Sequence, residues 1–233
     1  ATWTNGITAI STDSFAVGDA GATNDNTETF VAWCWKESNS DAGFDIVTYT
    51  GNTTSGQTYS HSLSAVPHFM SVRCRNNGDN WMVYHHKMAS DPETDYAQLN
   101  TTAAAGDSTG IWNDTAPTSS VFTLGNSGTV NENYNYVAYL WTEKQGFSKF
   151  GTYEGNGNTN GTFVYTGFRP AMVMLKSVDS TNGWEMRDNK RPGYNLSSGT
   201  LAPSSSDAET TGEGIDIFSN GFKCRASGNG QNG

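Results

Sequence analysis

The chain has 233 residues and a net charge of −10, and 35% of its residues are hydrophobic, 15% charged and 12% aromatic. The aromatic content, which includes seven Trp, excludes a disordered chain, and 13 Lys and Arg without a dense basic cluster exclude a nucleic-acid-binding surface. No apolar run reaches the ~18 residues of a membrane-spanning helix, so membrane insertion is not expected.

Short runs rich in β-branched and aromatic residues alternate with turn signals along the whole chain. Asn-Gly pairs, which favour type I′ hairpin turns, recur between these runs. The pattern predicts an antiparallel all-β fold of sandwich type, jelly-roll or lectin-like, with little or no helix. The best helical candidate is a short turn over residues 91–99, where Asp91 would cap the helix and Pro92 would take its first position.

The first strongly apolar run covers residues 30–35, with the sequence FVAWCW. A strand that is apolar on both faces is typical of a central position that is covered on both sides. Because side chains alternate along a strand, both faces of this run are apolar: Phe30, Ala32 and Cys34 on one, and Val31, Trp33 and Trp35 on the other. We therefore expect this segment to be a buried central strand.

The sequence after residue 42 is a tandem repeat. GFDIVTYTGN, from Gly43, is matched by GFSKFGTYEGN, from Gly146, and Trp81 is matched by Trp184. The spacing between matched residues falls slowly along the chain, as small loop deletions after a duplication would produce. Each unit has about one hundred residues, which is the size of a β-sandwich. We expect leading strands in residues 1–42, a first repeat in residues 43–142 and a second repeat in residues 143–233.

The repeat pattern has an extra strand at its start, and its last repeat lacks the strand that would close it. FVAWCW at residues 30–35 matches YVAYLW at residues 136–141, which closes the first repeat, whereas the second repeat ends in SGNGQNG. Three explanations are open. The chain is cut from a longer array, residues 12–35 close the second repeat within the chain, or they complete a neighbouring subunit by strand donation. The loop-like ends and the missing initial Met favour the first.

The three cysteines form neither a disulfide framework nor a zinc-binding spacing. Buried free thiols in strands are therefore expected at Cys34, Cys74 and Cys224. Alternation after Pro67 and its counterpart Pro170 assigns further side chains to a buried face, namely Met70, Val72 and Cys74 in the first repeat and Val173 and Leu175 in the second.

Trp112 lies in the polar run GIWNDTAPTSS and has no matched Trp in the second repeat. An aromatic ring beside Asn113 and Asp114 is typical of a sugar-binding surface, because the ring packs on the sugar face while polar groups bind hydroxyls. The alternative, which loop Trp residues adopt more often, is that the ring folds over the sandwich edge into the core. Trp81 and Trp184 recur at matched strand starts and are expected in the core.

His85 and His86 are the only adjacent histidines. Neighbours on a strand point to opposite faces, so one metal ion cannot readily bind both. A structural or solvent-facing role is favoured, and ligand binding by His85 is retained as the alternative. No common hydrolase or phosphate-binding motif occurs, and no spacing supports a carboxylate dyad. We predict no enzyme activity and no cofactor, with calcium held by loop oxygens such as those of SSSDAETTGEG as an alternative.

A set of phrases together resembles a repeated domain of tailed phages: FVAWCWK, AGFDIVTYTGN, WNDTAPTSSVFTLG, YVAYLW, GFSKFGTYEGNG, FVYTGFRPAMVMLK, DNKRPGYN and IDIFSNGFK. That domain is found in tail fibres and related virion proteins, notably of phages from marine bacteria and cyanobacteria. The resemblance implies a non-enzymatic structural protein on the exterior of a virion, with other virion proteins as partners. By analogy with fibres it also implies a homo-oligomer, often a trimer, and recognition of a host-surface glycan.

Two other functions are weighed against a tail fibre or spike. A capsid decoration protein or strand-donating filament subunit requires residues 12–35 to pair with a different chain. A polysaccharide-degrading tailspike enzyme requires two carboxylates that converge in a groove.

Overall fold

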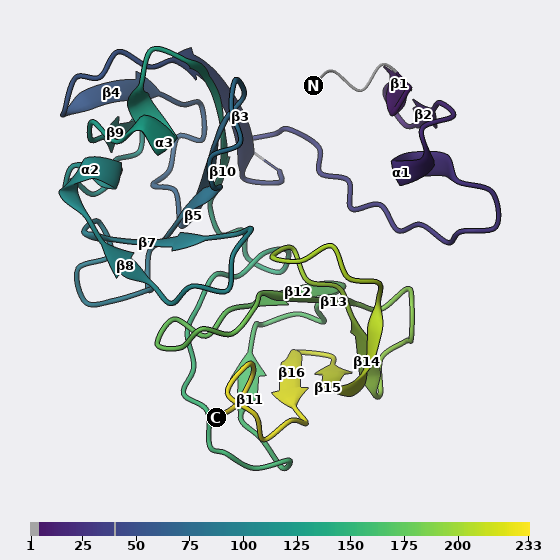
Figure 1. The fold of residues 1–233 in the computed structure, drawn as a ribbon. Coiled ribbons are helices and arrows are strands. Elements are labelled where there is room, and N and C mark those ends of the chain that lie inside the picture. The colour runs from purple at the N-terminus through teal and green to yellow at the C-terminus, as the bar shows by residue number, and fades with distance from the viewer. Residues whose placement is uncertain (1–4, 40) are drawn as a thin grey trace. The chain divides into compact units, whose positions relative to one another are not determined.

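The computed structural model describes residues 5–39 and 41–233, and the chain divides into two compact units, residues 1–35 and residues 36–233. Both units contain antiparallel strands, and the three helices of the described residues have four residues each (Figure 1). The predicted all-β fold is thus confirmed. Both expected repeats lie within the second unit.

The N-terminal unit contains one hairpin and one helix, formed by β1 (Ile7–Ile10), β2 (Phe15–Val17) and α1 (Gly21–Asn24). Residues 30–35 form no strand, so the expectation of a buried central strand is wrong for this structure. Phe30 is 48% exposed, and Cys34 is an exposed free thiol rather than a buried one. A lone hairpin offers no sheet faces that could cover a strand on both sides, so the burial that a central strand requires is missing.

The first repeat has two layers. A six-stranded sheet has the order β3-β10-β5-β6-β7-β8, and a two-stranded β4–β9 sheet forms the other layer together with two short helices. The elements are β3 (Phe44–Thr50), β4 (Gln57–Ser60), β5 (Phe69–Cys74), β6 (Met82–His85), β7 (Asp95–Gln98), β8 (Gly106–Asp107), α2 (Thr109–Trp112), β9 (Val121–Leu124), α3 (Gly128–Asn131) and β10 (Asn135–Trp141).

Strand β10 lies inside the six-stranded sheet, because it pairs with β3 along one edge and with β5 along the other. Its alternate residues Tyr136, Ala138 and Leu140 point into the core between the two layers. They meet the predicted apolar face of β5, where Met70 and Val72 are buried. The sequence YVAYLW therefore has the central position that its two apolar faces indicate.

The second repeat has a four-stranded sheet in the order β11-β16-β15-β14 and a two-stranded β12–β13 sheet. Its elements are β11 (Phe163–Tyr165), β12 (Met172–Leu175), β13 (Glu185–Asp188), β14 (Ser197–Thr200), β15 (Thr210–Phe218) and β16 (Gly221–Cys224). The β11–β16 pair corresponds to β4–β9, since Val164 lies opposite Phe222 as Tyr59 lies opposite Phe122. Its core contains the predicted Val173 and Leu175.

The duplicated phrase Tyr-x-Gly-Asn has the same structural role in both repeats. Tyr49 Oη donates to the carbonyl of Val130 at 2.7 Å, and Tyr153 Oη donates to the carbonyl of Gln231 at 2.6 Å. A Cβ at Gly51 would collide with the backbone around Asn131, so only glycine fits there. The phrase does not connect a hairpin, because β3 pairs with β10 and β4 pairs with β9.

The two repeats pack on each other through a third apolar cluster. Phe69, Val83 and Ala97 of the first repeat meet Trp184 of the second, with Phe150 packed against the same group. The core position predicted for Trp184 is therefore confirmed. Its counterpart is only partly buried: the Trp81 ring stacks on Tyr139 with centroids 6.0 Å apart, and the Arg73 guanidinium lies 5.8 Å from its centroid.

The helix candidate at residues 91–99 is wrong. The amide of Thr94 donates to the carbonyl of Asp91 at 3.0 Å and closes a single turn, after which the chain enters β7. The pairing of Gln98 with Met82 in the sheet outweighs the weak local preference for a helix. Among the described residues, no helix has the length and apolar character that crossing a bilayer requires.

Candidate functional site

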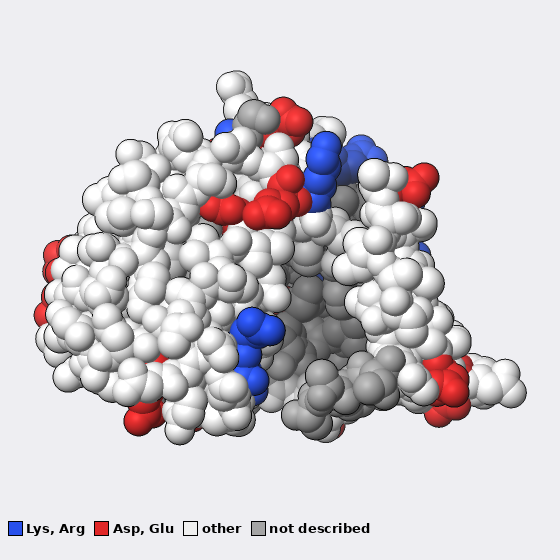
Figure 2. Space-filling view, turned by 90° about the horizontal axis from the view of Figure 1, so that it is seen from above, with Lys and Arg blue, Asp and Glu red and all other residues white. Residues whose placement is uncertain are grey.

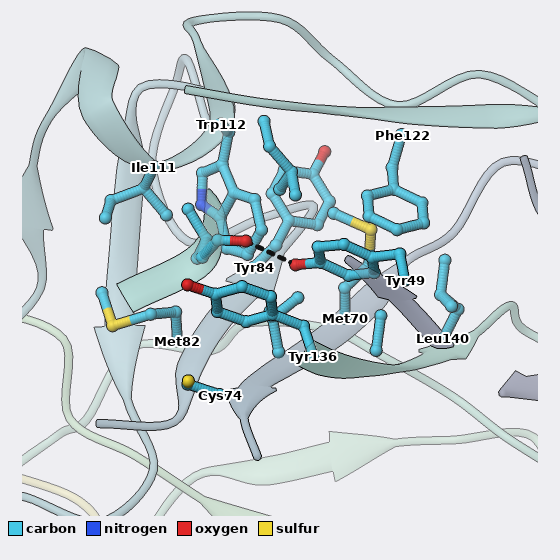
Figure 3. Close-up of a cluster of buried hydrophobic side chains, with 14 of the residues drawn as sticks. Tyr49, Met70, Cys74, Met82, Tyr84, Ile111, Trp112, Phe122, Tyr136 and Leu140 are labelled. Carbon is cyan, nitrogen blue, oxygen red and sulfur yellow. Dashed lines mark hydrogen bonds between the residues drawn. The ribbon is translucent and has the colours of Figure 1, made fainter. Parts of the chain in front are cut away.

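Trp112 is buried, with 1% of its surface exposed, so its ring cannot be the sugar-binding platform that the sequence suggested. Ser108 caps α2 and turns the indole inward. The indole Nε1 donates to the carbonyl of Asp95 at 2.9 Å, and the ring lies edge-on to Tyr84 with centroids 6.0 Å apart (Figure 3). The alternative weighed for this residue, that it folds into the core, is the observed one.

The two polar neighbours of Trp112 stay outside the core. Asn113 adopts a left-handed conformation with φ of 56°, and its Oδ1 accepts a hydrogen bond from the Ser55 hydroxyl at 2.6 Å. Asp114 is exposed and also has a positive φ, of 45°. The two residues cap the end of α2, and the structure does not combine them with the indole into one binding surface.

His85 belongs to the opposite face of the sheet from Trp112. It lies at the end of β6 beside Phe69 and Phe150, and its Nδ1 accepts the amide of Lys87 at 3.1 Å. Burial, followed by repulsion from neighbouring cations, lowers the pKa of His85 to about 4. The imidazole is therefore neutral at physiological pH. The four predicted site residues do not converge.

The second repeat instead contains an open cavity of about 430 Å³, which we call the Gln231 pocket. Strands β13, β14 and β15 and the turn at residues 228–231 form its walls. The walls carry hydroxyl, amide, carboxylate and guanidinium groups together with the backbone of several glycines. The lining residues are Asn182, Gly183, Trp184, Glu185, Arg187, Thr200, Ala202, Thr210, Thr211, Gly212, Ala226, Gly228, Gly230 and Gln231.

Three side chains of this pocket replace apolar core residues of the first repeat. In the register of the two copies, Glu185 and Arg187 take the positions of Met82 and Tyr84 on the second strand after the proline, and Gln231 takes the position of Val130. Met82, Tyr84 and Val130 are all buried in the first core. The second copy has therefore exchanged part of an apolar core for a polar triad.

The triad is connected internally. Gln231 Nε2 donates to Glu185 Oε2 at 2.7 Å, and an Arg187 guanidinium nitrogen lies 2.8 Å from the same oxygen. Arg187 also donates to the carbonyl of Ser197 at 3.0 Å. Gln231 is 8% exposed, yet its Oε1 has no hydrogen-bond partner among the described residues. A buried amide oxygen without a partner carries a desolvation cost that a hydrogen-bond donor would remove.

Glycine stands in β15 where the first repeat has the helix α2. The Gly125 amide donates to the carbonyl of Ile111, and the corresponding Arg225 amide donates to the carbonyl of Gly214. A Cβ at Gly214 would collide with the backbone carbonyl of Ser197, so this position of β15 requires glycine. The next residues in the two copies, Trp112 and Ile215, are both buried in their cores.

Comparison with known proteins adds one result. The model of a family described as a domain of unknown function, DUF7483, matches residues 1–233. The chain belongs to this family. No curated protein and no solved structure matches it. For this DUF7483 domain, the relation to phage virion proteins therefore remains an expectation from the sequence.

Some ionised groups of the DUF7483 domain form local pairs. Arg191 bridges Asp188 and Glu209, and Lys149 pairs with Glu143. On the face shown in Figure 2, Lys and Arg occur in small groups rather than in a broad basic patch. No group of three or more His, Cys, Asp or Glu side chains in residues 5–39 and 41–233 could hold a metal ion. Loop-bound calcium stays a prediction without an identified site.

Sequence reasoning missed the Gln231 pocket, although a signal for it exists. Aligning the two copies sets the polar residues Glu185 and Arg187 opposite an apolar Met82 and an aromatic Tyr84. The second copy thus has polar side chains at positions that form the core in the first copy. Such positions indicate a difference in function between the two copies.

Proposed function

We propose that the chain is a non-enzymatic structural protein on the exterior of a phage virion, part of a tail fibre or spike, and that the Gln231 pocket binds a host-surface glycan. The observation that carries the binding proposal is that Gln231, a lining residue of the pocket, has a buried Oε1 without a hydrogen-bond partner among the described residues. The virion context, its other proteins as partners and an oligomeric state, trimeric by analogy, rest on the sequence resemblance.

The chemistry of the pocket suits a polyhydroxylated ligand. A sugar hydroxyl can donate to Gln231 Oε1, and Glu185 and the Thr210 hydroxyl offer further acceptors at the wall. The planar guanidinium of Arg187, a lining residue, offers N–H donors for sugar oxygens. A volume of about 430 Å³ is within the range of small-ligand sites.

The same lining argues against hydrolysis. A glycosidase of the usual kind needs two carboxyl groups that flank the scissile bond. Glu185 is the only carboxylate among the described lining residues, and its Oε2 is already held by Arg187 and Gln231. Binding without cleavage is therefore favoured over a polysaccharide-degrading tailspike.

A shallow polar pocket binds weakly, because water competes for every hydrogen bond that it offers. A fibre compensates by presenting several copies of the site, since linked sites raise the overall affinity without new contacts. The tandem β-fold supplies a rigid carrier for such sites, because each repeat packs on the next through Trp184. A structural role and glycan recognition are therefore compatible in one molecule.

The test is a glycan array probed with the chain displayed multivalently, comparing the wild type with Gln231→Val. Valine is the residue that the first repeat has at this position, so this variant should keep the fold while losing the amide. We expect Gln231→Val to lose binding, whereas the control Asn113→Ala, Asp114→Ala keeps it. A wild type that binds no glycan overturns the recognition proposal. Binding that survives Gln231→Val and fails in the control moves the site to the loop after α2.

A further inference from the structure

Strand β12 of the second repeat has an open edge. In the first repeat, its counterpart β5 pairs with β6 along one edge and with β10 along the other. Among the described residues β12 pairs with β13 alone, in a two-stranded sheet. The counterpart of β3, residues 148–153, joins no sheet beyond the single bridge of Ser148 to Lys144. The position that β10 occupies in the first repeat is thus unfilled in the second.

The open edge requires a strand that is apolar on both faces. Val173 and Leu175 of β12 point into the second core, while Met174 between them points to the cluster shared with the first repeat. A strand added beside β12 would continue both of these surfaces. An exposed edge with apolar neighbours is also a template for pairing with another chain.

Residues 30–35, which we call the donor segment, have the required pattern. Their sequence FVAWCW matches YVAYLW of β10, and these two segments hold the only Val-Ala pairs of the chain. The donor segment forms no strand in its own unit, and the Phe30 side chain is half-exposed. The chain therefore contains one unfilled strand position and one exposed segment of matching sequence.

We propose that the open edge of β12 binds the donor segment of a second copy of this chain. The register follows from the first repeat, where Tyr136 lies opposite Cys74 and Tyr49, and Leu140 lies opposite Met70. Transferred to the second repeat, Phe30 lies opposite Ser177 of the β12 side and Tyr153 of the other side. Cys34 lies opposite Val173.

The aromatic contacts support this register. In the first repeat the rings of Tyr49 and Tyr136 stack with centroids 5.1 Å apart and planes 10° from parallel. In the second repeat Tyr153 has the position of Tyr49 and is only partly buried. In the proposed complex Phe30 takes the position of Tyr136 and covers the Tyr153 ring.

The division of the chain into two units argues for a second copy rather than the same chain. The donor segment belongs to the compact unit of residues 1–35, whereas β12 belongs to the unit of residues 36–233. Three residues after the donor segment, Ser38 pairs with Phe44 at the start of β3. A donor segment from a second copy can fill the open edge while this pairing and both units stay as they are.

The first test is disulfide cross-linking with the native thiol of Cys34. Opposed residues of antiparallel strands have Cα separations within the disulfide range, so Val173→Cys should link to Cys34 of a second molecule. The background carries Cys224→Ala, because Cys224 shares the second core with Val173. Met174→Cys, which points to the other face, is the control. After mild oxidation we expect covalent dimers with a 34–173 peptide for Val173→Cys and several-fold less for the control.

Two outcomes overturn the proposal. A 34–173 link within single chains makes the same molecule the donor, and no 34–173 link in a folded protein means that the donor segment does not bind there.

The second test does not depend on a core substitution. Ala32→Asp changes an exposed residue whose counterpart Ala138 is buried in β10. It should weaken self-association, measured by light scattering, by roughly a hundredfold or more, since the strand would bury an unpaired carboxylate. Ile10→Asp, at a position 80% exposed, should leave self-association unchanged. Equal association of Ala32→Asp and wild type contradicts the proposal.

Discussion

The indole Nε1 of Trp184 donates to the backbone carbonyl of Gln98 at 2.8 Å, and this bond joins the second repeat to the first. The ring is buried beside Val83 and Ala97, so the hydrogen bond lies within an apolar cluster rather than at the surface. Such a bond is worth more than an exposed one, because water cannot replace the lost partner. The two repeats therefore fold as neighbours that stabilise each other.

Trp184→Phe should lower the free energy of unfolding by about 1–2 kcal/mol, because it removes a hydrogen bond that is shielded from water and leaves the Gln98 carbonyl with the longer bond from the Thr101 amide alone. Trp184→Ala should cost about 3–5 kcal/mol through the added cavity. Urea unfolding followed by circular dichroism measures both. The control Trp81→Phe, at the partly exposed counterpart, should cost less than about 1 kcal/mol. Equal losses at the two tryptophans would contradict the assigned role of Trp184.

Asn131 is the polar centre of the first repeat. Its Nδ2 donates to the carbonyls of Thr54 and Gly125 at 2.9 and 2.8 Å, and the side chain is fully buried. Asn131→Leu should cost about 3–5 kcal/mol, because buried backbone groups lose their partners. Asn232→Leu, at the matched position, should destabilise the second repeat in the same way. Asn135→Ala, at an exposed position, should change stability by less than about 1 kcal/mol in the same urea titration.

His85 makes the protein sensitive to mild acid. Burial first, and then repulsion from His86 and Lys87, lowers the pKa of His85 to about 4, whereas the unfolded chain binds this proton near its ordinary value of about 6.5. The unfolded state therefore binds more protons between these values, and the free energy of unfolding falls as the pH drops from about 6.5 to about 4. His61 and His68 also have lowered pKa values, chiefly through burial, and act in the same direction.

The variant His85→Asn tests this acid sensitivity. The Asn side-chain oxygen can accept the amide of Lys87 as His85 Nδ1 does, but it does not titrate. We expect the loss of stability between about pH 6.5 and about pH 4.5 to be smaller in the variant, by up to ~1.4 kcal/mol for each pH unit over which His85 alone titrates. This range lies above the titration of most carboxylates. An unchanged pH slope in urea unfolding would remove His85 as its cause.

The comparison of sequence with structure shows which information is local. Alternation identified the core faces of β5 and β12 because a strand's side-chain directions follow from its own residues. The same alternation failed for residues 30–35, because whether an apolar strand forms depends on a partner edge and not on the segment itself. The sugar-binding interpretation of Trp112 is wrong for a related reason. Its loop is polar, but a four-residue helix capped by Ser108 turns the ring inward.

The Gln231 pocket could be reached only by combining distant positions. Glu185, Arg187 and Gln231 lie up to 46 residues apart, and each takes the position of a core residue of the first repeat. No local motif records such an exchange. The alignment of the two repeats shows it, because each copy predicts which residue type the other should contain. Positions where the second copy differs from this prediction identify the site.

The buried tyrosines of the first core predict a loss of stability at high pH. Burial raises the pKa of Tyr84 and of Tyr136 to about 12, whereas the unfolded chain ionises near 10. The stability these groups contribute is complete below about pH 10 and is lost as the pH rises toward about 12. Tyr84→Phe keeps the ring that packs on Trp112 and removes one ionisable group, so its stability should fall less steeply over this range. Urea unfolding at several pH values, with tyrosinate absorbance recorded in parallel, measures the difference. A variant whose stability falls as steeply as that of the wild type would show that Tyr84 is not a source of the alkaline loss.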